Sequence, residues 1–467
     1  MGAPKATDIA IAAKPERRSL LGRLTDFCVF LFEKIMPDPY VFAVALTFVA
    51  AALAYGFAPE GSVANIAAGW YSGLFDILSF AFKIILILVT GYVLANAPAI
   101  HSLLEKVASL AESPRSAISL TVLVSLIAGW FNWGFGLVAA ALVAREIAKR
   151  VRLDFGWLVA AAYSGFVISV EGLSGSIALS QATPGSALNI VEKVTGHSLP
   201  LSKTVFAPFS FLPVVALLII LPIALRRTEP SAARSIVADS ERLRAEDKPK
   251  PLREKSNTVG ARLDRAWILN VALALGGLFA LALRWRNTGL SLNLDSVILI
   301  FLCLGLLFHW TPFAYVEAMK SASRVTGPLI LQYPLYGGIM GIMTATGLAS
   351  VISKAFLAFS TARTLPFWSY LASLVITLFI PSGGGHWAVQ GPFVIPAAKA
   401  LHASLAGTTM GVAMGESVGN TIQPFFALPV LAIAGIGMRR VMGFMVITFL
   451  IALITYGASL LFLVPQG

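Results

Sequence analysis

Residues 381–392 read P-S-G-G-G-H-W-A-V-Q-G-P and interrupt a long apolar run that extends from 365 to 401. Two prolines bracket three consecutive glycines. These residue types disfavour a continuous helix, because proline lacks a backbone donor and glycine loses much conformational entropy on folding. In hydrocarbon every unpaired N–H and C=O is costly, so such a break persists only where protein encloses it or where it lines a wet cavity. The stretch is therefore a candidate binding site within a membrane.

The composition indicates a membrane protein. The chain has 467 residues, of which 57% are hydrophobic and only 12% are charged, too few charges to cover a soluble protein of this length. Many windows are apolar over roughly the 20 residues that cross a bilayer. We therefore predict an all-α, polytopic fold with broken helices and re-entrant hairpins, surrounded by the lipid bilayer.

The formal net charge of +12 does not indicate a nucleic-acid partner, because the basic residues lie between the apolar runs, where they orient a membrane protein. Cys28 and Cys303 lie far apart in apolar surroundings and suggest neither a disulfide nor a cysteine metal site. No cofactor is implied. The N-terminus lacks the apolar core and cleavage site of a signal peptide. We expect it to remain in the cytoplasm, with the protein in a bacterial inner membrane.

Composition divides the chain into six parts. These are a cytoplasmic N-terminus with an amphipathic helix (1–36), a first transmembrane span (37–69), membrane repeat A (70–225), a basic cytoplasmic linker (226–265), two connecting spans (266–313) and membrane repeat B (314–467). Repeat A is expected to begin with a surface segment at 70–83 and a span at 84–97. The linker is interpreted as a solvated segment, because it carries the longest run of basic residues.

The two repeats are inferred from patterns that recur in the same order. T-A-R-T-L at 361–365 resembles S-P-R-S-A at 113–117, and the alignment of 411–422 with 165–177 sets Glu416 opposite Glu171. With the N-terminus and the linker both cytoplasmic, repeat A begins outside and repeat B begins inside. Inverted repeats with broken helices that meet near the midplane are typical of secondary transporters, which work by alternating access.

Four interruptions form two symmetric pairs, 129–136 with 381–392 and 171–175 with 416–424. A half-helix N-terminus offers free N–H groups and about half a positive charge, so it can hold a carboxylate without a buried cation. The alternatives are tight helix packing for the glycines and a packing role for the histidine. The candidate substrate contacts are Asn132, Trp133, Gly134, Ser382, Gly383, Gly384, Gly385, His386, Trp387 and Gln390.

Two acids lie within these predicted breaks. An ionised carboxylate at the bilayer centre costs roughly 2.5 to 3.5 kcal/mol on insertion scales, so it is normally paired, protonated or functional. Three roles stay open for these acids: proton carrier, sodium ligand, or acceptor for exposed helix-end amides. The candidate coupling site, for a proton or a sodium ion, comprises Glu171, Ser174, Glu416, Asn420 and Gln423.

The glycine-rich stretch resembles the short-chain fatty acid transporter family. Its motif P-S-G-G-G-x-W-x-x-Q-G-P is matched at 381–392, with His386 at the variable position, and its G-E-S-x-G-N pattern is matched at 415–420. The pattern of spans agrees over nearly the whole chain. The resemblance implies uptake of small monocarboxylates such as acetoacetate or butyrate.

The sequence thus predicts a secondary transporter of short-chain monocarboxylates, coupled to protons, and not an enzyme. One alternative is a sodium-coupled carrier of other carboxylates. Another is an intramembrane enzyme with His386 and Glu416 as acid and base, although no nucleophile or metal set is spaced for it. A channel is a further alternative hypothesis for the function. The expected partners are a small carboxylate, a coupling ion and the bilayer, and assembly into a homo-oligomer stays open.

Overall fold

The computed structural model describes residues 39–230, 237–241, 243, 258–378, 380–422 and 425–465. These residues form helices and short connections, with one isolated β-bridge between Asp154 and Val237. The predicted amphipathic helix within 1–36 and most of the linker at 226–265 lie outside the described residues. The all-α prediction is confirmed for the part of the chain that is described.

The helices fall into three groups along the chain. The first half contains α2 (Pro39–Phe57), α3 (Val63–Asp76), α4 (Leu78–Ala95), α5 (Pro98–Ala108), α6 (Pro114–Phe131), α7 (Trp133–Ala148), α8 (Phe155–Ser164), η2 (Gly165–Ile168), α9 (Ser176–Gln181), α10 (Ile190–Thr195), η3 (Leu201–Lys203) and α11 (Pro208–Leu225). The connecting group contains α13 (Val259–Leu263), α14 (Trp267–Thr288) and α15 (Leu294–His309). The second half contains α16 (Pro312–Ser323), α17 (Gly327–Ala345), α18 (Leu348–Phe359), α19 (Leu365–Ile376), α20 (Gly383–Ala400), α21 (Leu405–Ile422), η5 (Phe425–Ala427), α22 (Leu428–Ala434) and α23 (Met438–Phe462).

Among the described residues, six helical segments are long and apolar enough to cross a bilayer, and the pair α17–α18, bent by 77°, makes a seventh. An apolar helix of bilayer length, 40–57, lies within the first span predicted at 37–69. The predicted division into a surface segment at 70–83 and a span at 84–97 is wrong, because 63–95 forms one apolar helical segment of 33 residues. The protein is a multi-pass membrane protein.

The order of elements repeats between the two halves. Helices α4, α5, α6 and α7 correspond to α17, α18, α19 and α20, followed by α8 with α21 and α11 with α23. The segment α3–α4 runs antiparallel to α17, because Gly69 lies against Gly341, Gly73 against Gly337, and the Phe80 ring against the Tyr333 ring. The equivalent helices α4 and α17 therefore point in opposite directions, as inverted repeats require.

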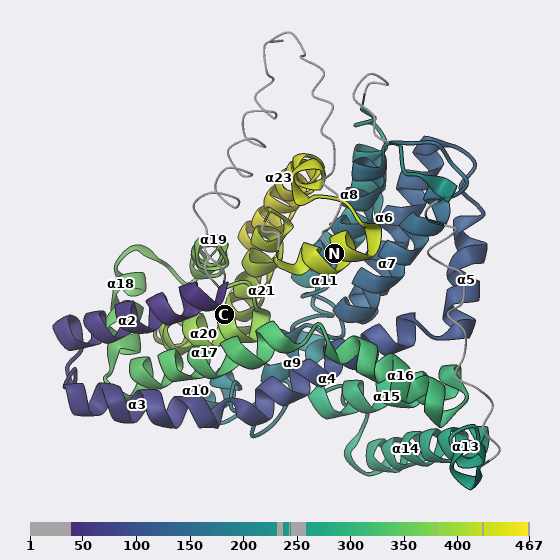
Figure 1. Cartoon of the computed structure of the whole chain (residues 1–467). Coiled ribbons are helices and arrows are strands. Elements are labelled where there is room, and N and C mark those ends of the chain that lie inside the picture. The colour runs from purple at the N-terminus through teal and green to yellow at the C-terminus, as the bar shows by residue number, and fades with distance from the viewer. Residues whose placement is uncertain are drawn as a thin grey trace, which may run out of the picture.

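Glycines set the close approach of α3 and α17, which lie side by side in Figure 1. A Cβ atom at Gly73 would lie 2.2 Å from the carbonyl oxygen of Gly337, and one at Gly341 would lie 2.0 Å from that of Gly69. These distances leave no room for a side chain. Small residues at such positions allow membrane helices to pack backbone to backbone, so this pair is a rigid part of the fold.

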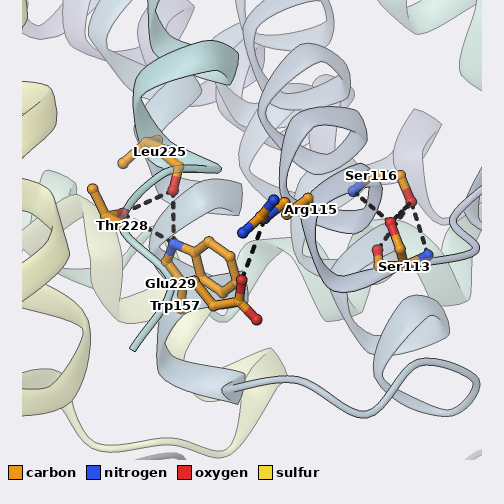
Figure 2. A network of polar contacts seen from close by, with 7 residues as sticks. All are labelled: Ser113, Arg115, Ser116, Trp157, Leu225, Thr228 and Glu229. Carbon is orange, nitrogen blue, oxygen red and sulfur yellow. Dashed lines mark hydrogen bonds and ion pairs between the residues drawn. The ribbon is translucent and has the colours of Figure 1, made fainter. Parts of the chain in front are cut away.

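A polar network anchors one end of α6, α8 and α11 (Figure 2). Ser113 and Ser116 form a capping box at the start of α6. Trp157, a buried residue of α8, donates its indole N–H to the carbonyl oxygen of Leu225 at 3.0 Å. The carbonyl that accepts this bond belongs to the last turn of α11, where no intrahelical donor remains. The network thus fixes where the three helices end relative to one another.

The helix breaks are shorter than predicted. The first break is confined to Asn132, between α6 and α7, and the second, between α19 and α20, includes the described residues 377, 378 and 380–382. The glycines at 383–385 form the first turn of α20, which then continues through Pro392 and Pro396. The prediction that 381–392 is unwound throughout is therefore wrong. The first N–H groups of a helix have no intrahelical acceptor, and the Ser382 side chain accepts the N–H of Gly385 in this turn.

The predicted break at 171–175 is confirmed, since the chain is non-helical between η2 and α9 and Glu171 lies within that loop. The predicted break at 416–424 is wrong in its first part. Helix α21 continues to Ile422, so Glu416 lies inside a regular helix, and the next described element begins at Phe425. The two acids therefore occupy corresponding places in the order of the repeats, but Glu171 lies in a loop and Glu416 lies in a helix.

Candidate functional site

Each break is capped by its own polar side chain. Asn132 adopts an extended conformation, and its side-chain oxygen accepts the N–H of Phe135 at 2.9 Å. Its side-chain amide donates to the carbonyl oxygen of Ile87 at 3.3 Å. At the start of α20, the Ser382 hydroxyl accepts the N–H of Gly385 at 3.4 Å. Both side chains thus satisfy helix ends, the usual role of Asn and Ser at such positions.

The tip of the α6–α7 hairpin is joined to the loop that carries Glu171. The N–H of Trp133 donates to the Ser174 hydroxyl at 2.9 Å, and the N–H of Leu173 donates to the carbonyl oxygen of Trp130 at 2.8 Å. Ser174, predicted as part of the coupling site, therefore binds the first amide of α7. Movement of this hairpin would displace the loop with it.

Beside these tips lies a small cavity of about 30 Å³. One part of its wall is polar, with Ser169, Ser176, Ser382 and Glu416, and another part is aromatic, with Trp133, Phe166 and Phe426. The rest of the wall is formed by Ile84, Val170, Gly175, Leu329, Tyr333 and Gly383. None of these lining residues is Lys or Arg. The wall thus offers a polar end and an apolar end to one small molecule.

The polar end is compact. A Cβ atom at Gly383 would lie 2.5 Å from the Ser176 hydroxyl oxygen and 3.7 Å from Oε2 of Glu416. The start of α9, the first turn of α20 and the middle of α21 therefore meet at this point. A substituent on Gly383 would enter the space between the hydroxyl and the carboxyl group, so the absence of a side chain keeps that space open.

The aromatic end is a packed set of rings. The rings of Phe166 and Phe426 stack with centroids 4.7 Å apart, and Trp133 meets Phe426 edge-on at 5.8 Å. Phe166 belongs to η2 and Phe426 to η5, the two short helices next to the breaks of the two halves. Offset and edge-on pairs of this kind stabilise a fixed ring geometry. The rings define a wall of constant shape.

The predicted substrate residues divide into two sets. Trp133, Ser382 and Gly383 line the cavity, whereas Asn132, Gly134, Gly384, Gly385, His386, Trp387 and Gln390 do not. A Cβ atom at Gly384 would lie 2.5 Å from the Phe80 ring, and one at Gly385 would lie 2.3 Å from the Tyr336 ring. These two glycines make room for aromatic rings instead of presenting amides to the cavity.

His386 and Gln390 connect α20 to α19. Nε2 of His386 lies 2.9 Å from the Ser373 hydroxyl and 2.6 Å from Oε1 of Gln390. The side-chain amide of Gln390 donates to the carbonyl oxygen of Ser369 at 2.9 Å. This chain of bonds engages Nε2 of His386 and the side-chain amide of Gln390, while Nδ1 of His386 is buried without a hydrogen-bond partner among the described residues. Their positions favour the packing interpretation of the histidine.

Glu171 and Glu416 are fully buried and incompletely bonded. Oε2 of Glu171 accepts the Tyr456 hydroxyl at 3.0 Å, and the side-chain amide of Asn420 donates to Oε1 of Glu416. Oε1 of Glu171, Oε2 of Glu416 and Oδ1 of Asn420 have no hydrogen-bond partner among the described residues. Buried acceptors without donors are costly. The cluster therefore suits a proton or a small cation, and Gln423 lies outside the described residues.

A separate group of possible metal ligands lies elsewhere in the fold. Among the described residues, His101, Glu105 and Glu146 place one ligand atom each within 4.8 Å of one another, on α5 and α7. Lys149 already forms an ion pair with Glu146. Because that carboxylate has a cation partner, this group is a weaker candidate for an ion than the buried cluster.

Sequence reasoning missed several residues of the cavity wall. Ser169, Tyr333, Phe166 and Phe426 carried no motif, and Tyr333 lies in the middle of an apolar helix. Phe166 and Ser169 do fall within the aligned segment 165–177, so the internal repeat was the signal that pointed to them. Ser176 was a neighbour of the predicted coupling site.

The fold and this amphipathic cavity suit a membrane transporter. The structure is similar to that of the YdaH transporter of Alcanivorax borkumensis, with a TM-score of 0.51, 16% sequence identity, and coverage of 91% of this chain and 97% of that one. That similarity supports the fold.

Sequence comparison gives the family. The family model described as "Short chain fatty acid transporter" matches residues 20–463. Two proteins named "Putative short-chain fatty acid transporter" are similar to this chain. The one from Escherichia coli (strain K12) is 37% identical over 432 residues, 92% of this chain and 97% of its own length. The one from Haemophilus influenzae is 35% identical over 429 residues, 91% and 96% of the two lengths. The chain belongs to the short-chain fatty acid transporter family.

Proposed function

We propose that this protein is a secondary active transporter of the bacterial inner membrane that carries short-chain monocarboxylates, such as butyrate or acetoacetate, by alternating access together with a proton. The polarity of the cavity lining supports the substrate class. A small acid needs polar contacts for its carboxyl group and an apolar wall for its chain, and the serine and aromatic ends of the cavity offer both. The N-terminus is proposed to face the cytoplasm.

The observation that carries the proposal is the position of Glu416 in the cavity wall. Its Oε2 atom has no partner among the described residues, and the cavity lining contains no Lys or Arg. Two ionised carboxylates in one buried site repel each other strongly. A carboxylate substrate therefore binds beside Glu416 only when that side chain carries a proton. Substrate and proton then occupy the site together, and release of the substrate allows release of the proton.

Transport in proteoliposomes tests this proposal. An inward proton gradient should drive accumulation of labelled butyrate, and collapse of the gradient with a protonophore should abolish it. The Glu416→Gln variant imitates the protonated side chain, so it should still exchange butyrate across the membrane but should no longer accumulate it. No uptake of butyrate or acetoacetate by the wild type under any ion gradient would remove the proposal.

Sodium coupling is the second candidate, and the oxygen atoms without donors favour it. Oε1 of Glu171, Oε2 of Glu416 and Oδ1 of Asn420 are hard oxygen ligands of the type that sodium takes. Replacement of sodium by choline separates the candidates, because it should leave proton-coupled uptake unchanged and should abolish sodium-coupled uptake. The intramembrane enzyme has less support, because Glu416 lines the cavity while His386 does not.

A further inference from the structure

A second, larger cavity lies between α3 and α17 on one side and α10 and α20 on the other. It is here called the lysine cleft. It has a volume of about 500 Å³, against about 30 Å³ for the inner cavity. Its lining includes Asp76, Lys193, Met340, Met343 and Pro396. Lys193 is the only Lys or Arg among the lining residues, and Asp76 is the only acid.

The two walls of the lysine cleft belong to different packed units. Helices α3 and α17 are held together by their glycine contacts. On the other wall, two side chains of α20 bind the segment around α10. Trp387 donates its indole N–H to the carbonyl oxygen of Leu188 at 3.0 Å, and Lys399 donates to that of Val194 at 2.6 Å. The two units also pack on each other, since Gly385 of α20 meets the Tyr336 ring of α17, and the cleft lies beside that contact.

Charge and apolar surface are combined in the lysine cleft. Nζ of Lys193 donates to the carbonyl oxygen of Ala187 at 2.6 Å, which leaves two of its three N–H donors for other acceptors. Partial burial lowers the pKa of Lys193, and the Asp76 carboxylate on the opposite wall raises it in part. Met340, Met343 and Pro396 provide adaptable apolar surface beside the ammonium group. This combination suits an anion with a short apolar chain.

The same helices line the lysine cleft and the inner cavity. On α17 the inner cavity reaches Tyr333 and the cleft begins at Met340. Seven residues at a rise of 1.5 Å place the two roughly 10 Å apart along this helix. On α20 the inner cavity reaches Gly383 and the cleft begins at Pro392, about 14 Å further along by the same rise. The two spaces are thus consecutive along both helices.

Three buried rings pack against α20 at Gly384 and Gly385, between Gly383 of the inner cavity and Pro392 of the cleft. Phe80 lies with its ring centroid 6.2 Å from that of Tyr333, which lies 6.5 Å from that of Tyr336. Gly384 and Gly385 provide the surface of α20 on which Phe80 and Tyr336 rest. These three side chains are here called the ring barrier. A molecule that moved along α20 from the lysine cleft to the inner cavity would meet the ring barrier.

We propose that the lysine cleft is an antechamber that binds a short-chain monocarboxylate through Lys193 before the molecule passes the ring barrier. The inference rests on the proposed function for its ligand. The carboxylate contacts the Lys193 ammonium group, and the acyl chain lies on Met340, Met343 and Pro396. The Asp76 carboxylate on the other wall repels the bound anion and so weakens this binding. The antechamber raises the local concentration of substrate beside the inner cavity.

Charge variants at the two walls test the antechamber. In vesicles of phosphatidylcholine alone and at low ionic strength, Lys193→Gln should raise the KM for butyrate about threefold and leave Vmax unchanged. Asp76→Asn should lower KM, and Lys193→Arg should behave like the wild type. At 1 M salt the differences should vanish, because charges are then screened within about 3 Å. Lys203→Gln, which removes an exposed lysine outside the cleft, should leave KM unchanged.

The outcomes separate the two proposals. If the wild type does not transport butyrate or acetoacetate, the proposed function fails. If the wild type transports butyrate but Lys193→Gln and Asp76→Asn leave KM unchanged or shift it in the same direction, the antechamber is wrong. A KM effect that appears only when phosphatidylglycerol is added would make the cleft a lipid site and would also overturn the antechamber.

Discussion

The aromatic end of the inner cavity should set the longest acyl chain that the protein accepts. Phe426 stacks on Phe166 and closes this end together with Trp133. The variant Phe426→Ala removes six carbon atoms from the wall, which leaves room for about two more methylene groups of substrate. Each buried methylene contributes about 0.8 kcal/mol. Two of them add about 1.6 kcal/mol, so hexanoate should gain roughly 15-fold in kcat/KM relative to butyrate.

Competition in proteoliposomes measures this change. Uptake of labelled butyrate is inhibited by unlabelled acids of four, six and eight carbons, and the inhibition constants are compared between wild type and variant. The variant should also be less stable in detergent, since truncation of a buried phenylalanine costs about 3 to 5 kcal/mol. Phe206→Ala provides a control, because Phe206 contacts Trp130 outside the cavity lining and is half-exposed.

Two results would refute the reasoning. If Phe426→Ala retains the selectivity of the wild type while remaining folded and active, the acyl chain does not lie at the aromatic end. If Phe206→Ala relaxes chain-length selectivity as much as Phe426→Ala, the effect arises from general loosening of the fold and not from the cavity wall. A milder variant, Phe426→Leu, should shift selectivity in the same direction by a smaller factor. It keeps the test usable if Phe426→Ala does not fold.

Three further predictions follow from the packing. Gly384→Val should reduce butyrate uptake at least tenfold, because its side chain would collide with the Phe80 ring, whereas Gly276→Val, with nothing within 4 Å of a Cβ atom, should transport normally. Gly73→Leu should lower the midpoint of thermal unfolding in detergent, since overpacking costs about 1 to 3 kcal/mol, and an unchanged midpoint would contradict the tight α3–α17 contact. Trp157→Phe should cost about 1 kcal/mol of unfolding free energy through its lost hydrogen bond, and no change would show that the bond adds nothing.

The sequence predicted the fold class well, for physical reasons. Apolar runs of bilayer length permit few structures other than helices, so composition and run length identify a polytopic helical protein. The repeat was visible because the same turn and helix-start residues recur in order, as at 113–117 and 361–365. The boundary at 70–83 was misplaced. Asp76 and Lys83 made that segment look interfacial, whereas one continuous apolar helical segment includes both residues.

The site was predicted less well, because local sequence does not show what a side chain contacts. Gly384 and Gly385 looked like an amide cradle, and only tertiary packing shows that the rings of Phe80 and Tyr336 occupy the space beside them. Phe426 is far from the glycine tract in sequence and gave no local signal. The pairing of Glu171 with Glu416 came from the repeat, yet one acid lies in a loop and the other in a helix.

The glycine tract at 383–385 lies beside both the inner cavity and the ring barrier. Movement of this tract would therefore affect access to both proposed substrate spaces. Gly383 faces Ser176 and Glu416 in the inner cavity, while Gly384 and Gly385, the next residues of the same turn, support the ring barrier. Displacement of the first turn of α20 would therefore change two things together: the polar end of the inner cavity and the surface on which the rings of Phe80 and Tyr336 pack. If the proposed transport cycle moves this turn, opening of the barrier and exposure of Glu416 should occur together, because the turn contacts both. Proton binding at Glu416 and substrate entry past the ring barrier would then be coupled directly through this turn, without a chain of intervening residues.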